Sequence, residues 1–187
     1  MTTPHLPILT VTLNPALDMS TSVPQVTPGP KLRCTEPMLD PGGGGLNVSR
    51  AIAALGGDSL ELVALGGITG DRLATMLQAE NIRFLALRSP GETRLSITVD
   101  ETGTGRQFRF VLPGPVWETQ HQAQVFDALE SLAKPGWFGV ISGSQMPGVP
   151  TDFYTLLTKV MPDMQIILDT SGPALEQACA VPIPGPS

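Results

Sequence analysis

A run of consecutive glycines is the feature of this sequence best suited to bind a ligand. Because glycine has no Cβ, a ligand can approach the main-chain N–H groups of Gly42–Gly45 directly. The residues that follow, 48–55, have the pattern of a helix that ends at Gly56. Backbone donors at a helix N-terminus bind hydroxyl or phosphate oxygens, so the run predicts a site for a ligand that carries such groups.

Two other interpretations of the run fit the sequence less well. A flexible linker is the simpler one, but a linker is rarely followed at once by a helix with a clean glycine stop. A Walker A loop is the other, and it requires a Gly-Lys-Ser/Thr segment that does not follow Gly42–Gly45.

An acidic residue near the N-terminus, Asp18, follows a predicted strand. Residues 8–13 form a short β-rich run, and the segment from Asn14 to Asp18 comes directly after it. Loops at the C-terminal ends of parallel strands build ligand sites in α/β proteins. Asp18 is therefore either an acceptor for sugar hydroxyls or a loop carboxylate in water, and its spacing alone does not decide between them.

Composition and charge exclude several classes of function. The chain has 187 residues and a formal net charge of −6, and its lysines and arginines form no cluster, which argues against a nucleic-acid partner. No apolar run reaches the length of a membrane span, and the N-terminus lacks a basic segment followed by an apolar one. Cys34 and Cys179 are far apart, which suits reduced thiols in the cytoplasm better than a disulfide or a metal site. We therefore expect a cytoplasmic protein without a bound metal in this chain.

The elements that must position these residues alternate between strand and helix. Strands are expected at 8–13, 59–65, 82–87, 137–142 and 164–169, and helices at 48–55, from about 69, at 119–133, 151–161 and 173–180. This order predicts an α/β fold with a mostly parallel sheet flanked by helices.

One segment departs from that alternation. Residues 94–112 alternate apolar and polar side chains around a glycine-containing turn, which predicts an antiparallel hairpin with one apolar face. Together with extended pieces such as 32–34 within residues 19–40, the hairpin would form a small antiparallel sheet at one edge of the core. Such a sheet suits a lid, and its apolar face would need a cover, for which we expect a second subunit.

Several motifs, taken in order, resemble the PfkB-type carbohydrate kinases of the ribokinase superfamily. Within that family the likeness is greatest to the minor-type 6-phosphofructokinases. The motifs are Leu-Asn-Pro-Ala-Leu-Asp at 13–18, Gly-Pro-Lys-Leu-Arg at 29–33, the glycine run with Asn47, Gly-Gly-Ile-Thr-Gly-Asp at 66–71, Thr93-Arg94, Phe-Val-Leu-Pro-Gly at 110–114, Ser-Gly-Ser-Gln-Met-Pro-Gly-Val at 142–149 and Asp-Thr-Ser-Gly at 169–172.

The resemblance implies a sugar site made of particular residues. Asp18 and Asn47 would contact the sugar hydroxyls, with the backbone of Gly42, Gly43, Gly44 and Gly45 beside them. Gly143 and Ser144, at the end of a core strand, would line the floor of the sugar pocket.

The same resemblance assigns the phosphate of the sugar to basic side chains. Arg94 would pair with it, because a guanidinium fork fits the oxygens of a phosphate. The alternative for Arg94 is a solvated residue of the lid, although it falls on the polar face of the predicted hairpin. Lys31 is a second candidate for anionic groups.

The resemblance implies an ATP-dependent kinase that phosphorylates a fructose phosphate, with Mg²⁺ and a homodimer formed through the β lid. A 1-phosphofructokinase or a tagatose-6-phosphate kinase is the alternative within the family. Members of the family also carry a Lys-Pro-Asn segment and a Gly-Ala-Gly-Asp motif that holds the catalytic base, and neither occurs here. We therefore expect residues 1–180 to be the N-terminal part of the kinase domain, with lid segments at about 19–40 and 88–112. The C-terminal part of the fold would be missing, and residues 181–187 would be a proline-rich tail.

The absence of the Lys-Pro-Asn and Gly-Ala-Gly-Asp motifs bears on catalysis. No catalytic residue is assigned in this chain, and no complete site for ATP or Mg²⁺ is expected in it. A non-catalytic fragment that binds a sugar phosphate is accordingly an alternative function.

Overall fold

The computed structural model describes residues 7–180, so the proline-rich segment 181–187 lies outside the described residues. Strands and helices alternate along most of the chain, as expected. In chain order the elements are β1 (Ile8–Thr12), β2 (Ala16–Val23), β3 (Met38–Gly42), α1 (Gly44–Ala54), β4 (Ser59–Leu65), α2 (Gly67–Ala79), β5 (Phe84–Arg88), β6 (Arg94–Glu101), β7 (Arg106–Val111), α3 (Thr119–Leu132), β8 (Phe138–Ser142), α4 (Phe153–Lys159), β9 (Gln165–Asp169) and α5 (Pro173–Ala180).

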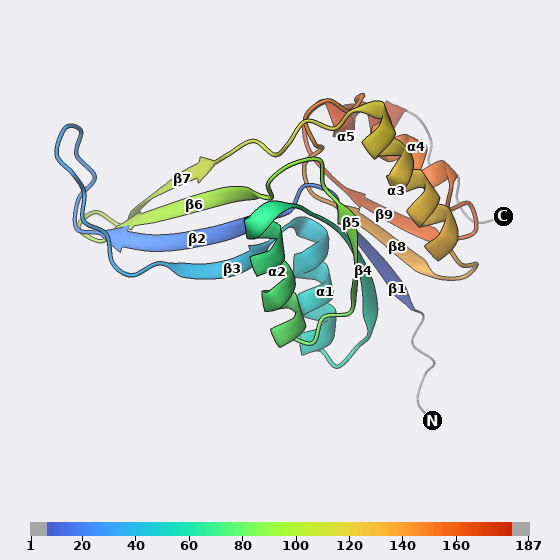
Figure 1. The fold of residues 1–187 in the computed structure, drawn as a ribbon, viewed down its shortest axis with the longest axis horizontal. Coiled ribbons are helices and arrows are strands. Elements are labelled where there is room, and N and C mark those ends of the chain that lie inside the picture. Colours follow the sequence, from blue (N-terminus) through green and yellow to red (C-terminus); the bar gives the residue numbers. More distant parts are fainter. Residues whose placement is uncertain (1–6, 181–187) are drawn as a thin grey trace.

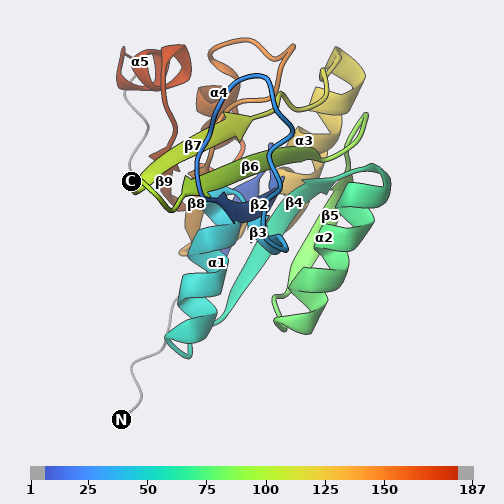
Figure 2. The same cartoon turned by 90° about the vertical axis from the view of Figure 1, so that its left-hand side faces the viewer.

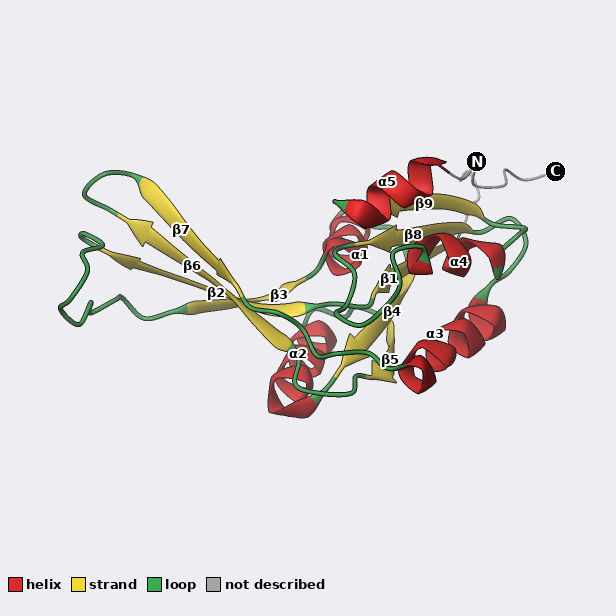
Figure 3. Ribbon diagram, turned by 90° about the horizontal axis from the view of Figure 1, so that it is seen from above, coloured by secondary structure: helices red, strands yellow, loops and turns green. Residues whose placement is uncertain are grey.

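The core is a five-stranded sheet in the order β5-β4-β1-β8-β9, and every neighbouring pair in it is parallel. The predicted α/β architecture is confirmed. Helices cover both faces of the sheet, with α1 and α2 on one side and α3 and α4 on the other (Figure 3). Strands that are covered on both faces bury their side chains in both directions.

The two faces of the sheet differ in chemistry. On the α3 and α4 side, Leu9 and Val11 of β1 join a large apolar cluster. The alternate residues of the same strand, Thr10 and Thr12, are also buried but carry hydroxyls. They point to the side of α1, because successive side chains of a strand alternate between faces.

A second sheet, which we call the lid, extends from the core (Figures 1 and 2). Its strand order is β3-β2-β6-β7, and the antiparallel hairpin of β6 and β7 confirms that part of the prediction. The expectation of a wholly antiparallel lid is wrong, because β2 and β6 pair in parallel over their full lengths. The parallel pairing arises because both strands leave the same edge of the core in the same direction.

The extended pieces within residues 19–40 also differ from the expectation. Residues 32–34 are not in a strand, and the strands β2 and β3 lie on either side of them. Strand β2 includes Asp18, which the sequence placed in a loop. The signal for this strand was the alternation of Leu17 and Met19 with Asp18 and Ser20, which the abundance of Ser and Thr obscured.

The helices deviate from the expected bounds mainly at their ends. Helix α1 begins at Gly44 rather than at residue 48, so half of the glycine run forms its first turn. Helix α4 is shorter than the expected 151–161. Within residues 7–180, no helix combines the length and the apolar character that crossing a bilayer requires.

Candidate functional site

The glycine run lies where the core sheet changes direction. From β1 the chain proceeds to β4 and β5 on one side, whereas β8 and β9 lie on the other, so β1 and β8 flank the switch point of the sheet. Ligands of open α/β sheets bind at the C-terminal ends of the strands at this point. The N-terminus of α1 is packed directly against these strand ends.

The glycines of the run pack closely against other parts of the chain. A Cβ on Gly42 would collide with the carboxylate of Asp18, and one on Gly44 would collide with the hydroxyl of Ser142. A Cβ on Gly45 would come within 2.8 Å of the carbonyl oxygen of Val11. The run therefore joins β2, β8 and β1 at one point, and larger residues would separate them.

Gly43 has a further requirement. Its φ is 141°, outside the range that L side chains readily adopt. A Cβ there would also meet the methyl group of Thr12 at 2.5 Å. The hydroxyl of Thr12 accepts the N–H of Leu46 at 2.9 Å, which ties the first turn of α1 to the end of β1. The N-cap residue of α1, Gly43, has no side chain that could cap the helix.

Asn14 connects the two sides of the switch point. Its Nδ2 donates to the Oγ of Ser144 and to the carbonyl oxygen of Gln145, both at 3.1 Å. The hydroxyl of Tyr154 donates to the carbonyl oxygen of Ser144 at 2.9 Å. These bonds hold the loop after β8 beside the corner between β1 and β2.

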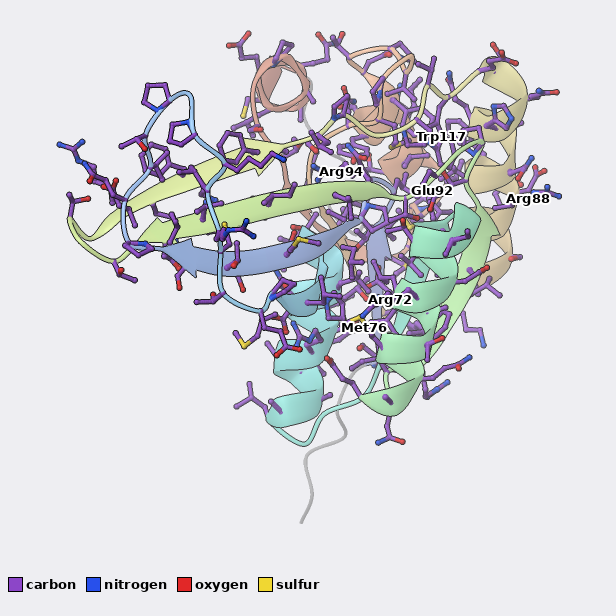
Figure 4. The ribbon with its side chains drawn as sticks, turned by 60° about the vertical axis from the view of Figure 1, so that its left-hand side comes forward. Arg72, Met76, Arg88, Glu92, Arg94 and Trp117 are labelled. Atoms are coloured by element: carbon purple, nitrogen blue, oxygen red, sulfur yellow. The ribbon has the colours of Figure 1, made fainter. Side chains whose placement is uncertain are left out.

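Arg94, at the start of β6, supports the same corner. Its Nε and Nη2 both donate to the carbonyl oxygen of Asn14 at 3.2 Å. Figure 4 shows Arg94 at the end of the lid that adjoins the core. Burial lowers the pKa of the Arg94 guanidinium, and the nearby Asp18 carboxylate opposes that shift.

Asp18 faces the polar side of the lid. It lies opposite Ser96 on β6 and Asp40 on β3. Burial raises the pKa of the Asp18 carboxyl, while a hydrogen bond with Ser96 and the charges of Arg94 and Arg109 act in the opposite direction. A half-buried carboxylate beside a guanidinium can accept hydrogen bonds from hydroxyl groups and can balance a positive charge. A site for a polar ligand requires both properties.

The end of β8 is joined to the end of β9. The Oγ of Ser142 donates to Oδ2 of Asp169 at 2.7 Å, and the N–H of Gly143 donates to the carbonyl oxygen of Asp169 at 2.9 Å. Gly143 has a φ of 123°, which favours glycine. The residues predicted to form the floor, Gly143 and Ser144, therefore follow β8 directly, and Gly143 is hydrogen-bonded to the end of β9.

The structure thus brings most of the predicted residues together. Asp18, the four glycines, Arg94, Gly143 and Ser144 lie around the switch point, and Asn47 is exposed on the first turns of α1. Lys31 is an exception, because it is exposed on the loop between β2 and β3 at the far end of the lid.

Three residues that contribute to the site were not predicted as part of it. Thr12, Asn14 and Ser142 bind the first turn of α1, the loop after β8 and Asp169, respectively. A sequence signal existed for each, since all three are polar residues at the end of an expected core strand. Which partner each would meet depends on strand order, and that order could not be derived from their spacing.

A separate cleft opens at the ends of β4 and β5. Its volume is about 700 Å³, and Gly67, Arg88, Glu92 and His121 are among its lining residues. None of the predicted sugar-site residues lines it. Glu92 lies against the N-terminal end of α2 (Figure 4), where its Oε1 accepts the N–H of Thr69 at 2.5 Å.

Across residues 7–180, His, Cys, Asp and Glu side chains form no group of three that could hold a metal ion.

Comparison with known proteins agrees with this geometry. The sequence profile of the "pfkB family carbohydrate kinase" matches residues 12–186. The ATP-dependent 6-phosphofructokinase isozyme 2 of Mycobacterium tuberculosis is 44% identical over 171 residues, which is 90% of this chain and 50% of that protein. The isozyme 2 of Escherichia coli is 40% identical over 176 residues, which is 93% of this chain and 57% of that protein.

Solved structures agree as well. The phosphofructokinase-2 from Escherichia coli in complex with fructose-6-phosphate has a TM-score of 0.88 at 39% identity, covering 94% of this chain and 58% of that one. A possible 1-phosphofructokinase from Thermotoga maritima has a TM-score of 0.85 at 26% identity, over 94% and 57%. The chain spans about half the length of the curated relatives it matches.

Proposed function

Because the chain belongs to the pfkB family of carbohydrate kinases, we propose that it carries the sugar-phosphate-binding part of an ATP-dependent 6-phosphofructokinase. The observation that carries this proposal is the closure of the glycine run against three strand ends at the switch point. A site of this kind offers main-chain donors of α1 to a ligand and flanks them with the half-buried Asp18 and Arg94.

The proposed roles are those that the resemblance to the family implies, and the chemistry of each group suits them. Asp18 and Asn47 would bind sugar hydroxyls, and the turn at Gly143 and Ser144 would support the sugar from below. Arg94 would bind the phosphate with the N–H groups that its bonds to the carbonyl oxygens of Asn14 and Leu112 leave free. Lys31 would contribute only if the loop that carries it moves toward a bound ligand or reaches the site of another subunit.

The first experiment is calorimetric titration of the purified chain with fructose 6-phosphate. We expect saturable binding, and free fructose should bind more weakly because it lacks the phosphate. Fructose 1-phosphate and tagatose 6-phosphate test the related activities, since a tagatose-6-phosphate kinase of Staphylococcus epidermidis is 32% identical over 172 residues. Tighter binding of either alternative would reassign the sugar, and binding of none of the three would refute the proposal.

The second experiment is a coupled assay with ATP and fructose 6-phosphate. We propose that residues outside this match complete the ATP and Mg²⁺ sites, so the chain alone should bind sugar phosphate without turnover. Asp169 is the acidic residue best placed to act as a base, but its carboxylate already accepts the hydroxyl of Ser142. Turnover that Asp169→Asn abolishes would contradict this part of the proposal.

We also propose that the lid forms a homodimer through its apolar face. Leu17, Ile97 and Phe110 lie on that face by register, and Phe110 is 52% exposed. Ile97→Glu should shift the chain toward monomer in analytical ultracentrifugation, because a dimer would bury the new charge. Thr98→Glu, on the opposite face of the same strand, is the matched control. Equal sedimentation of the wild type and Ile97→Glu would exclude this interface.

The proposed location is the cytoplasm. Cys34 and Cys179 are both free and exposed, which suits a reducing compartment.

A further inference from the structure

A column of polar side chains is buried beneath α1. It consists of the fully buried Thr10 and Thr12 on β1, Ser49 on α1 and Glu61 on β4, with the partly buried Ser59 on β4 at its end. The Oγ atoms of Thr10 and Ser49 are 2.5 Å apart, and the Oγ of Ser49 donates to Oε2 of Glu61 at 3.2 Å. Ser59 donates to the Oγ of Ser49 at 3.1 Å. The helix is therefore fixed to the sheet by hydrogen bonds as well as by apolar packing.

Glu61 is the unusual member of this column. Its side chain is fully buried, and its Oε1 has no hydrogen-bond partner among the described residues. Burial raises the pKa of Glu61 to about 7, although hydrogen bonds with Thr10, Thr12 and Ser49 act in the opposite direction. A carboxyl in such a place is neutral in acid and becomes a buried charge as the pH rises.

The charged groups around the column are directed elsewhere. On α1, Arg50 pairs with Glu80 at 2.6 Å and approaches Asp40 at 3.7 Å. At the lower end of the column, Arg83 pairs with Asp58 at 2.5 Å. On β1 and β4, the residues facing Glu61 are hydroxyl-bearing or apolar. No described ion pair therefore compensates the charge of Glu61.

The upper end of the column reaches the glycine run. Thr12 accepts the N–H of Leu46 in the first turn of α1. The methyl group of Thr12 is the atom closest to a Cβ placed on Gly43. Ser49, the hydrogen-bond partner of Glu61, belongs to the same helix, so a change of charge on Glu61 acts on the element that carries the proposed sugar site.

We propose that Glu61 is a positioning residue, which through Ser49 sets the place of α1 against the core strands. The effect on sugar binding rests on the proposed function. When neutral, Glu61 is a weak acceptor for the hydroxyl of Ser49. When ionised, it accepts that hydroxyl more strongly and draws α1 toward β4, which shifts the first turn of the helix at the ends of the core strands.

The test follows the backbone amides of Gly43, Gly45 and Leu46 by NMR between pH 5.5 and 8.5 without ligand. In the wild type these amides should shift with a midpoint near 7. In Glu61→Gln, which keeps the shape of the neutral carboxyl, that transition should be absent. Glu130→Gln, at an exposed position of α3, should retain it.

Two features of the experiment distinguish the effect of Glu61 from the effects of other ionisable groups. Asp18 contacts Gly42, so Gly42 is left out, and Asp18→Asn should leave the transition in place. His121 is on α3, across the sheet from α1. Wild-type amides that do not move across this pH range, or that move equally in Glu61→Gln, would overturn the proposal.

Calorimetry with fructose 6-phosphate then tests the consequence for the site. The second ionisation of the sugar phosphate lies at about pH 6, so the affinity of both proteins should change between pH 6 and pH 8. The change in the wild type should differ from that in Glu61→Gln by roughly two- to tenfold, as expected for a coupled pair of neighbours. Amide shifts without any sugar-phosphate binding would refute the proposed function and leave the positioning role intact, so the two failures are distinguishable. A pH dependence of affinity equal in both proteins would remove Glu61 from the control of binding.

Discussion

The N-termini of α1 and α2 lie at the same edge of the same sheet, and in each the N–H of the third helical residue is accepted by a side chain from elsewhere in the chain, but the two acceptors differ. In α2 the acceptor for the N–H of Thr69 is a carboxylate, that of Glu92. In α1 the acceptor for the N–H of Leu46 is a neutral hydroxyl, that of Thr12, and glycines bring the first turn into contact with the strand ends. One helix end therefore carries a negative charge of the chain itself, and the other does not.

The acidic residues beside the two helix ends show the same difference. Hydrogen bonds from Thr69 lower the pKa of Glu92, as expected for a carboxylate that caps a helix. Burial raises the pKa of Asp18, which lies beside the first helix without capping it. The comparison teaches that two glycine-containing helix ends of one sheet can differ in whether the neighbouring carboxylate caps the helix.

The largest effect should come from Gly44→Ala. The new Cβ would overlap the hydroxyl of Ser142 and approach the carbonyl carbon of Ser142 to 3.0 Å, and backbone atoms cannot move aside cheaply. Calorimetry should show a loss of fructose 6-phosphate affinity of about 100-fold or more, since misplacement of a site by about 1 Å has effects of that order. Ala51→Gly, on the exposed side of α1, is the control. It should cost about 1 kcal/mol of stability without loss of binding. Full binding by Gly44→Ala would show that the glycine run is not at the site.

A smaller effect is expected for Arg94→Ala. Loss of charge-assisted hydrogen bonds, about 1.5–3 kcal/mol, should weaken fructose 6-phosphate binding by roughly tenfold or more. The same variant measured with free fructose separates two roles. If Arg94 binds the phosphate, only the phosphorylated sugar loses affinity. If it only supports the carbonyl of Asn14, both sugars lose equally, and the phosphate assignment is wrong. Arg106→Ala, at the far end of the lid, should change neither.

The smallest effect should come from Glu92→Ala, which makes the end of α2 resemble that of α1. Because the pKa of Glu92 is lowered from 4.5, its contribution to stability is present above that pH and is lost as the pH falls through the lower folded value. Melting temperatures should therefore differ slightly at pH 7 and converge in acid. Sulfate should stabilise the variant more than the wild type, because the freed N–H groups can donate to an anion. Identical melting curves in all conditions would mean that Glu92 is not a cap.

Some of this fold could be predicted from the sequence because the signals are local. The alternation of Leu95, Ile97 and Val99 identified the hairpin, and the glycines identified the helix that follows them. The parallel pairing of β2 with β6 could not be predicted, because it depends on where both strands leave the core. Only tertiary structure relates those two points.

The candidate site divides in the same way. Asp18 and Arg94 could be predicted because they lie in motifs that resemble those of the family. The bonds from Arg94 to Asn14 could not be predicted, because they join residues 80 positions apart. For Glu61 the sequence predicts only a place in a short strand, residues 59–65. Its burial under α1 follows from the strand order, and no pattern within residues 59–65 carries that information.

The central place of β1 has a consequence for how the protein folds. Strand β1 pairs with β4 early in the chain and with β8 much later, and Asn14 reaches Ser144 across 130 residues of intervening chain. Contacts between such distant residues close large loops, and they slow folding compared with local contacts. During synthesis, β1, β4, β5 and the lid are complete before β8 exists. When the glycine run and its neighbouring strands have been synthesised, the part of the candidate site that β8 supplies is therefore not yet present.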